Sequence, residues 1–299
     1  MPPTEQQGAG PLRRLFDHYA ADLEALDPAL GGRFQCPQCL TVIAPVEPLQ
    51  AVVAEEHVVP SALGGTTTTL TCRSCNNNSG SGLEADLVQR AFVDSGKRLP
   101  RTVVRIADTE VRGELAWPEA ESEPISIAVI KKQTDPRQVV AQQGLIRPGM
   151  PDIHLTSDWG YVPQKTHVAL LRAAYLLMFR YFGYRYITDR SAQDVRDQIQ
   201  DWRRDSNVLR GVLWRFNTEH VFTKPSILVV REPQDLVGFL VLLPLDTRRG
   251  HVAAVLLPPP GSDGREFYGT ALAHDRFIDM RATPLNGQPT IAPFVSFVL

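Results

Sequence analysis

Four cysteines are the residues whose types and spacing most clearly indicate chemistry in this chain. They form two Cys-x-x-Cys pairs, Cys36/Cys39 and Cys72/Cys75, and the sequence has no other cysteine. Thiolates at this spacing suit tetrahedral Zn²⁺, which binds sulfur at about 2.3 Å, whereas a redox dithiol normally needs one pair at a helix start. Four thiolates also close the metal shell and leave no position for water. We therefore expect a structural zinc site, with a redox dithiol or a chance pairing as the alternatives.

The segment between and after the two pairs carries further polar groups. It contains Glu55-Glu56-His57-Val58-Val59-Pro60, then Gly64-Gly65, and Asn76-Asn77-Asn78 directly after Cys75. This pattern resembles the HNH endonucleases of the His-Me finger (ββα-metal) superfamily, in which an acidic-His dipeptide ends a strand, a proline and Gly-Gly follow, and Cys-x-x-Cys-Asn opens a helix. The resemblance covers Arg33 to Phe92, about a fifth of the chain. It implies a zinc-stapled ββα unit that hydrolyses phosphodiester bonds.

The resemblance gives each polar residue a role. His57 corresponds to the general base that deprotonates water, and Glu56 to a carboxylate ligand of a catalytic Mg²⁺ or Mn²⁺ ion. Asn76 stands at the third motif position as a further ligand, with Asn77 as an open alternative. This division suits the reaction, because phosphodiester hydrolysis needs an activated water and neutralised phosphate charge, and Mg²⁺ favours few protein oxygens with retained waters.

Two positions depart from the family pattern. Thr67 or Thr69 stands where the family has its middle asparagine, and Ser79 replaces a frequent lysine. These departures leave a second hypothesis open, a catalytically weak or inactive zinc-stapled module that binds nucleic acid or protein. A zinc deaminase is excluded by residue order, because its signature is His-x-Glu and here Glu56 precedes His57.

Charge and hydropathy limit the partners. The net charge is -2 with 21% charged residues, so any DNA-binding surface must be local, and Arg73 and Arg90 are the best candidates for phosphate contacts. The expected partner is DNA, double-stranded by preference, and not a membrane. The polar start of the chain lacks a signal peptide pattern, and the apolar run Val168 to Phe179 is too short to cross about 30 Å of hydrocarbon. We expect a cytoplasmic protein; a role in bacterial defence is suggested only by the nuclease type.

Local patterns predict the elements that position the motif. Apolar residues at helical spacing over Pro11 to Leu26 predict an amphipathic helix that stops at Asp27-Pro28. A Val-rich strand is expected to end at His57, and Leu70 to Cys72 to form a returning strand. A capping box, Ser81 with Glu84, predicts that the following helix begins at Ser81.

The rest of the chain predicts a mixed α+β region with antiparallel strands. Strands are expected at 102–106, 111–117, 125–131, 226–231, 236–245, 251–257 and 290–299, and helices at 165–181 and 191–204. The Asp and Arg side chains of the last helix, Asp194, Asp197 and Asp201 with Arg196, Arg203 and Arg204, are expected to form exposed ion pairs. The expected division is an N-terminal helix (1–30), the HNH unit (31–97) and an α+β domain of unknown role (98–299).

Overall fold

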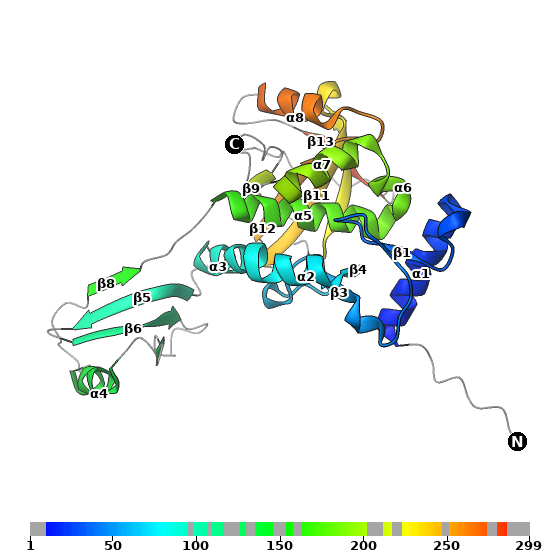
Figure 1. Ribbon diagram of the computed structural model, residues 1–299. Coiled ribbons are helices and arrows are strands. Elements are labelled where there is room, and N and C mark those ends of the chain that lie inside the picture. The colour runs from blue at the N-terminus through cyan, green and yellow to red at the C-terminus, as the bar shows by residue number, and fades with distance from the viewer. Residues whose placement is uncertain are drawn as a thin grey trace, which may run out of the picture. The chain divides into compact units, whose positions relative to one another are not determined.

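The computed structural model is an α+β protein of helices and antiparallel sheets (Figure 1). It describes residues 10–94, 98–106, 109–116, 126–129, 135–145, 154–157, 163–201, 212–216, 223–246, 251–273 and 280–285. The chain divides into two compact units, one formed by residues 1–85 together with 163–299 and the other by residues 86–162. These units differ from the expected three-part division, because the long helix after residue 162 packs against the N-terminal elements.

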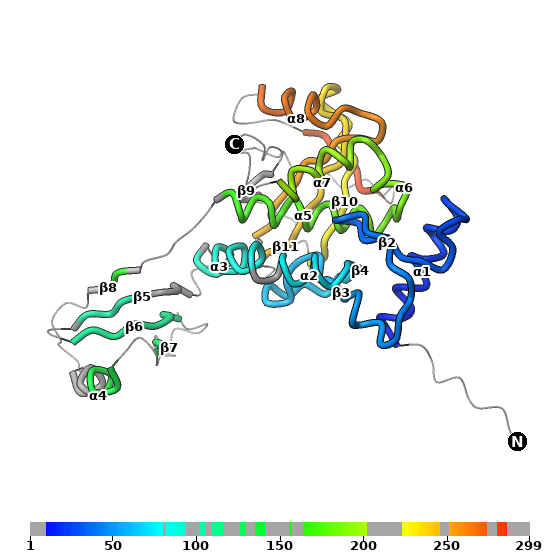
Figure 2. The backbone as a smooth tube through the Cα atoms, in the orientation of Figure 1, coloured from blue at the N-terminus to red at the C-terminus, as the bar shows by residue number. Residues whose placement is uncertain are grey.

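The first unit begins with α1 (Pro11–Leu26), at the bounds that its pattern predicts. Its apolar face buries Phe16, Tyr19 and Leu23, since these residues recur at helical spacing. A 3₁₀ turn, η1 (Pro28–Leu30), follows, and then the short antiparallel strands β1 (Phe34–Gln35) and β2 (Val42–Ile43), which flank the first cysteine pair. Helix α1 packs on β1 (Figure 2).

The polar motif lies on the next antiparallel pair, β3 (Val53–His57) and β4 (Thr68–Cys72). The predicted strand end at His57 is confirmed, and 3₁₀ turns, η2 (Leu49–Ala51) and η3 (Ser61–Leu63), precede and follow β3. The predicted helix start at Ser81 is wrong. Helix α2 (Arg73–Ser79) begins directly after β4, passes through a π-helical turn, η4 (Gly80–Glu84), and continues as α3 (Ala85–Asp94).

The early helix start has a local cause. The backbone N–H of Cys75 donates to the Cys72 sulfur at 3.3 Å, so a thiol satisfies an amide that a helix start otherwise leaves unpaired. The serine cap predicted further along is therefore not needed.

The C-terminal part of the first unit is built around α5 (Pro163–Phe182). Its apolar run Val168 to Phe179 is buried, and α6 (Tyr184–Ile187) and α7 (Arg190–Asp201) follow. The sheet has the order β13 (Arg281–Pro284), β10 (Ser226–Glu232), β11 (Gly238–Asp246), β12 (His251–Leu257) and β9 (Val212–Phe216), with every neighbouring pair antiparallel. Helix α5 packs against β11 and β12 and also against β4. The turn η5 (Gln234–Leu236) and helix α8 (Gly264–Ala273) complete this part.

The second unit holds a separate antiparallel sheet of order β7 (Ser126–Val129), β6 (Thr109–Ala116), β5 (Arg98–Ile106) and β8 (His154–Ser157). Helix α4 (Pro136–Leu145) packs on β6. The three strands predicted here are confirmed, whereas α4 and β8 lie in a stretch without clear periodicity. The strand predicted at 290–299 lies outside the described residues. Among the described helices none is long and apolar enough to cross a membrane.

Candidate metal centre and acidic site

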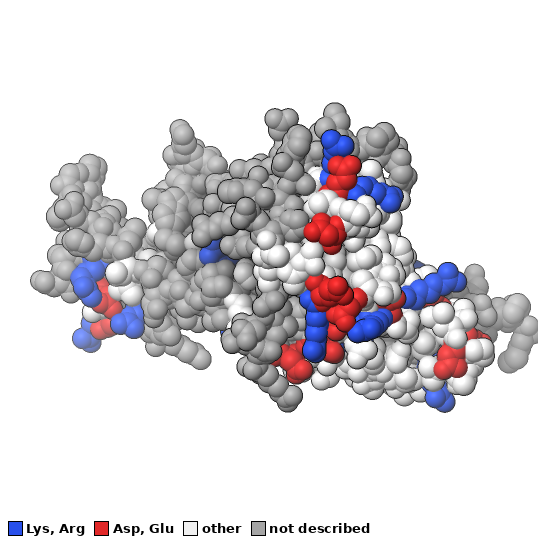
Figure 3. Space-filling view, turned by 90° about the horizontal axis from the view of Figure 1, so that it is seen from above, with Lys and Arg blue, Asp and Glu red and all other residues white. Residues whose placement is uncertain are grey.

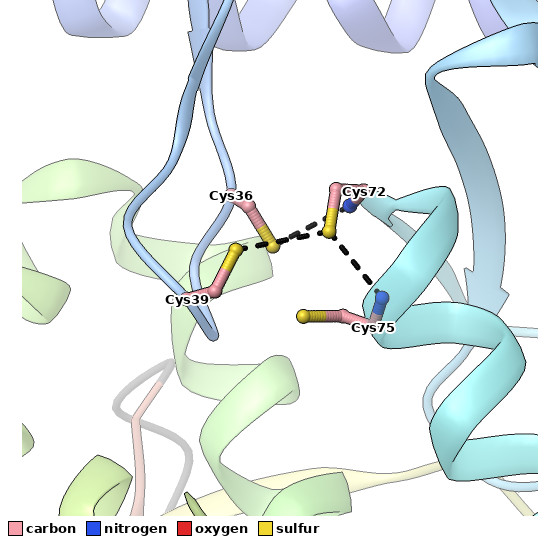
Figure 4. Close-up of side chains that lie close together, drawn as sticks. All are labelled: Cys36, Cys39, Cys72 and Cys75. Carbon is pink, nitrogen blue, oxygen red and sulfur yellow. Dashed lines mark hydrogen bonds between the residues drawn. The ribbon is translucent and has the colours of Figure 1, made fainter.

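The four cysteines form one cluster (Figure 4). Their sulfur atoms all lie within 4.8 Å of one another, and the Cys39 and Cys72 sulfurs are 3.7 Å apart. Sulfurs at the corners of a tetrahedral site with bonds of about 2.3 Å are separated by about 3.8 Å. The cluster could therefore hold a metal ion, with Cys36 and Cys39 presented by the β1–β2 loop and Cys72 and Cys75 by the junction of β4 and α2.

Hydrogen bonds and charge already organise the cluster. The Cys36 side chain is fully buried, and its sulfur accepts the backbone N–H of Cys72 at 3.4 Å. The hydrogen bond to Cys39 raises the pKa of Cys36, whereas the hydrogen bond from Cys36 lowers the pKa of Cys72 to about 6. The thiols thus share protons in the absence of a cation. A divalent ion would favour the ionised form of all four.

The first cysteine loop is held by the C-terminal helices, an arrangement that no sequence pattern predicts. Tyr175 of α5 donates its hydroxyl to the carbonyl of Pro37 at 2.6 Å. The Tyr184 hydroxyl donates to the carbonyl of Gln35 and accepts its N–H, both at 2.8 Å. The Gln200 amide donates to the carbonyl of Gln38. Side chains far along the sequence therefore bind the backbone that carries Cys36 and Cys39.

Glu56 and Asn76 are brought together by the next elements. Glu56 lies on β3 with 3% of its surface exposed, and Asn76 lies in the first turn of α2. The Asn76 side-chain nitrogen is 2.6 Å from Glu56 Oε2. Asn77 is exposed, so Asn76 is the carboxamide that contacts the buried carboxylate.

A buried arginine completes this acidic site. Arg172 Nη1 donates to Glu56 Oε1 at 3.1 Å, and Nη2 lies 3.0 Å from Glu56 Oε2 as an ion pair without hydrogen-bond geometry. The same Nη1 donates to Glu84 Oε1 at 2.7 Å. Burial raises the pKa of Glu84 to about 7. The Arg172 guanidinium opposes this rise, and the nearby Glu56 carboxyl adds to it. Sequence reasoning missed Arg172 and used Glu84 only as a helix cap.

His57 ends β3 and is half-buried. Side chains alternate along a strand, so His57 and Glu56 project to opposite faces of the ribbon. The two threonines at the middle motif position have different neighbours: the Thr67 carbonyl accepts the N–H of Val58 at 2.9 Å, and the buried Thr69 hydroxyl meets the Tyr19 hydroxyl at 2.8 Å. Thr67 therefore braces the chain directly after His57 through its backbone.

The Gly-Gly pair shapes the loop after His57. Gly64 has φ +82°, in the left-handed region that favours glycine. A Cβ on Gly65 would lie 1.8 Å from the carbonyl oxygen of Val59. Both glycines are thus required by the backbone of this loop.

The two predicted phosphate-binding arginines lie in different units. Arg73 is exposed at the start of α2, and its Nη1 donates to the carbonyl of Gln50. Arg90 lies on α3 in the second unit and is half-buried. On the face shown in Figure 3, basic and acidic side chains are interspersed among the described residues. This distribution agrees with the low net charge.

The site combines a cysteine cluster that could hold a metal ion with an acidic site. In the acidic site the Glu56 and Glu84 carboxylates share the Arg172 guanidinium, and the Asn76 carboxamide contacts Glu56. Oxygen donors of this kind suit a hard divalent cation, whereas the thiols suit a softer one. Comparison of the chain with models of protein families, with curated proteins and with solved structures found no match.

Proposed function

We propose that this chain is a metal-dependent endonuclease of the HNH type that hydrolyses phosphodiester bonds in DNA. The observation that carries the proposal is the 2.6 Å contact between Glu56 on β3 and Asn76 on α2, the residue that directly follows Cys75. This contact between the end of β3 and the start of α2 places two side chains that carry oxygen atoms close enough together to bind one ion. The proposal gives the cysteine cluster a structural Zn²⁺ ion, because four thiolates leave no coordination position for water.

Glu56 and Asn76 fit a catalytic Mg²⁺ or Mn²⁺ ion. Rotation of the Asn76 carboxamide by 180° exchanges its nitrogen and oxygen and places an oxygen beside Glu56 Oε2. Neighbouring oxygens around an octahedral Mg²⁺ with bonds of about 2.1 Å are about 3 Å apart. The observed separation is close to this value, so a small adjustment suffices for both side chains to bind one ion. Such an ion supplies charge neutralisation at the phosphate.

The remaining steps fall to groups of the chain itself. His57 is half-buried at the end of β3, and its imidazole would accept the proton of a water that attacks the phosphate from the face opposite to the Glu56 side. The bond between the Thr67 carbonyl and the Val58 N–H holds the backbone beside it. The exposed Arg73 would contact the phosphate backbone through donors that Gln50 does not use.

One observation favours a second candidate, a zinc-stapled binding module without activity. Arg172 contacts both oxygens of Glu56, so the buried carboxylate is charge-compensated by the protein alone. In this candidate Glu56 is a structural ion-pair partner, and binding to nucleic acid or protein does not depend on His57.

A cleavage assay separates the two candidates. Supercoiled plasmid, single-stranded DNA and RNA are each incubated with the protein in Mg²⁺, Mn²⁺ or EDTA, beside His57→Ala, Glu56→Gln and the control Glu55→Gln. Glu55 neighbours Glu56 on β3 but is exposed. We expect His57→Ala to lower the cleavage rate about 100-fold or more, as loss of a general base does, and Glu55→Gln to leave it unchanged. Equal cleavage by His57→Ala and the unmodified protein would refute the mechanism, and binding without cleavage in any metal would favour the module.

Metal analysis tests the structural ion separately. The purified protein should contain one zinc per chain, and Cys72→Ser should lose it. Cys72 is informative because its sulfur also accepts the Cys75 N–H at the start of α2. A Cys72→Ser protein that keeps its zinc and its stability would contradict the assignment.

A further inference from the structure

Arg172 is unusual in its surroundings. It is the one charged residue in the apolar run Val168 to Phe179 of α5, and 2% of its surface is exposed. Removing a guanidinium from water costs several kcal/mol unless well-placed partners compensate for it. The partners lie far away in the sequence, Glu56 on β3 and Glu84 in the π-helical turn η4. A helix that needed only packing at this position would carry an apolar residue.

The contacts of Arg172 restrict the Glu56 carboxylate. The two terminal nitrogens of the planar guanidinium face its two oxygens at 3.1 and 3.0 Å, which opposes rotation of the carboxylate about its last bond. Asn76 occupies a further position on Oε2. When the Asn76 carboxamide turns its oxygen toward Glu56, the lone-pair position on Oε2 that its nitrogen occupies opens for an ion bound by both side chains. An ion bound by Glu56 would therefore approach from a fixed direction.

Glu84 fixes Arg172 in turn. Its Oε1 accepts Nη1 at 2.7 Å, the shorter of the two hydrogen bonds of that nitrogen. The π-helical turn ends at Glu84 and widens the helix locally, and such turns are frequent at functional sites. When Glu84 is ionised, the two carboxylates and the guanidinium carry one net negative charge, which attracts a divalent cation.

We infer that Arg172 is a positioning residue of the proposed nuclease site, which orients the Glu56 carboxylate toward the catalytic ion while Glu84 anchors the guanidinium. The inference rests on the proposed function. Arg172 does not touch substrate; it acts through Glu56. Affinity for the catalytic ion therefore depends on a side chain of α5, outside the segment that carries the motif.

The test measures ion affinity and cleavage in Arg172→Lys, Glu84→Gln and the control Tyr186→Phe. Lysine keeps the charge but lacks the fork that orients Glu56, and glutamine keeps the shape of Glu84 but removes its charge. Tyr186 is buried like Arg172, and its hydroxyl has no hydrogen-bond partner among the described residues, so removing that hydroxyl breaks no hydrogen bond to the acidic site or the cysteine loop. For each protein, the Kd for Mn²⁺ is measured by electron paramagnetic resonance, the Mg²⁺ concentration for half-maximal cleavage is determined, and zinc content and circular dichroism report folding.

We expect the Mn²⁺ Kd and the half-maximal Mg²⁺ concentration to rise about tenfold or more in Arg172→Lys, since groups that orient metal ligands have effects of this size. Glu84→Gln should shift both quantities in the same direction, and Tyr186→Phe should leave them unchanged. If Arg172→Lys does not fold, Glu84→Gln decides the question, because its side chain is partly exposed. Unchanged ion affinity in the folded variants, or an equal rise in Tyr186→Phe, would overturn the inference.

The outcomes also separate this inference from the proposed function. If the unmodified protein binds Mn²⁺ but cleaves no nucleic acid, the nuclease proposal fails and the Mn²⁺ Kd values alone decide the role of Arg172. If the unmodified protein binds no Mn²⁺, there is no ion for Glu56 to be oriented toward, and both proposals fail.

Discussion

Removal of the Tyr175 hydroxyl should destabilise the first unit although it changes no atom of the motif. In Tyr175→Phe the Pro37 carbonyl loses the donor that now lies 2.6 Å away, and Pro37 is buried. The net loss of a hydrogen bond costs about 1 kcal/mol, and a buried carbonyl left without a partner costs about 1–2 kcal/mol more. Arg196 Nη1 also loses its contact with the hydroxyl but keeps the Ile187 carbonyl at 2.9 Å. The expected loss in unfolding free energy is therefore about 2–3 kcal/mol.

A matched control lies on the neighbouring helix. Tyr186 is buried like Tyr175, but its hydroxyl has no hydrogen-bond partner among the described residues. Tyr186→Phe removes a polar group that is already unsatisfied, so we expect no loss of stability and a gain of up to about 1 kcal/mol.

Urea unfolding followed by circular dichroism at 222 nm measures both variants, because the long helices of the first unit dominate this signal. A second measurement is the rate of zinc release to a chromogenic chelator, which Tyr175→Phe should increase, since Pro37 lies between Cys36 and Cys39. Loss of less than about 0.5 kcal/mol in Tyr175→Phe, or equal midpoints for the two variants, would refute the view that α5 holds the cysteine loop.

Two further predictions concern the backbone and the pH dependence of the first unit. Gly65→Ala should lower the unfolding free energy by about 3 kcal/mol or more, because the added Cβ would overlap the Val59 carbonyl. In the control Gly82→Ala the added carbon has no contact within 4 Å among the described residues, so this variant should be neutral or stabilising. Comparable stability of the two variants in thermal unfolding would contradict this prediction. Asp189 precedes α7 and accepts hydrogen bonds from Ser191 and Gly261; partial burial raises its pKa, but these bonds outweigh that effect and lower the pKa below 3.8. The stability that ionised Asp189 provides is complete above about pH 4 and is lost as the pH falls through the lower folded-state pKa. The thermal midpoints of the unmodified protein and of Asp189→Asn should therefore converge on acidification. A constant difference between the two midpoints from about pH 3 to 6 would count against this prediction.

Local patterns were sufficient where the cause of an element is local. Helix α1 has its predicted bounds because apolar spacing and the Asp27-Pro28 stop both act within a few residues. The strand end at His57 and the bounds of β12 follow in the same way from runs of β-branched and apolar residues. The start of the motif helix was missed, because its cap is the sulfur of Cys72, and a thiol is not among the usual capping side chains.

Pairing between distant segments explains the other errors. Arg196 was expected in an exposed ion pair along its helix, but it is buried and donates to the Ile187 carbonyl and the Tyr175 hydroxyl. Arg203 and Arg204, expected to take part in the same pairs, lie outside the described residues. Arg172 interrupts an apolar run, and the sequence alone offers no means of pairing it with Glu56, from which it is separated by 116 residues. Such contacts depend on tertiary packing, which periodicity does not encode.

Helix α5 makes the cysteine loop and the acidic site interdependent. Arg172 and Tyr175 are three residues apart and therefore lie on one face of this helix, where Arg172 meets Glu56 and Tyr175 meets the Pro37 carbonyl. A chain that ended before residue 163 would leave Glu56 without its buried counter-charge and Pro37 without its donor, and together these losses are a substantial part of the about 5–15 kcal/mol that separates folded from unfolded states. The motif segment is thus incomplete without α5. Residues 1–85 and 163–299 form one compact unit that contains all of these groups, and residues 86–162, which lie between them in the sequence, form a separate unit.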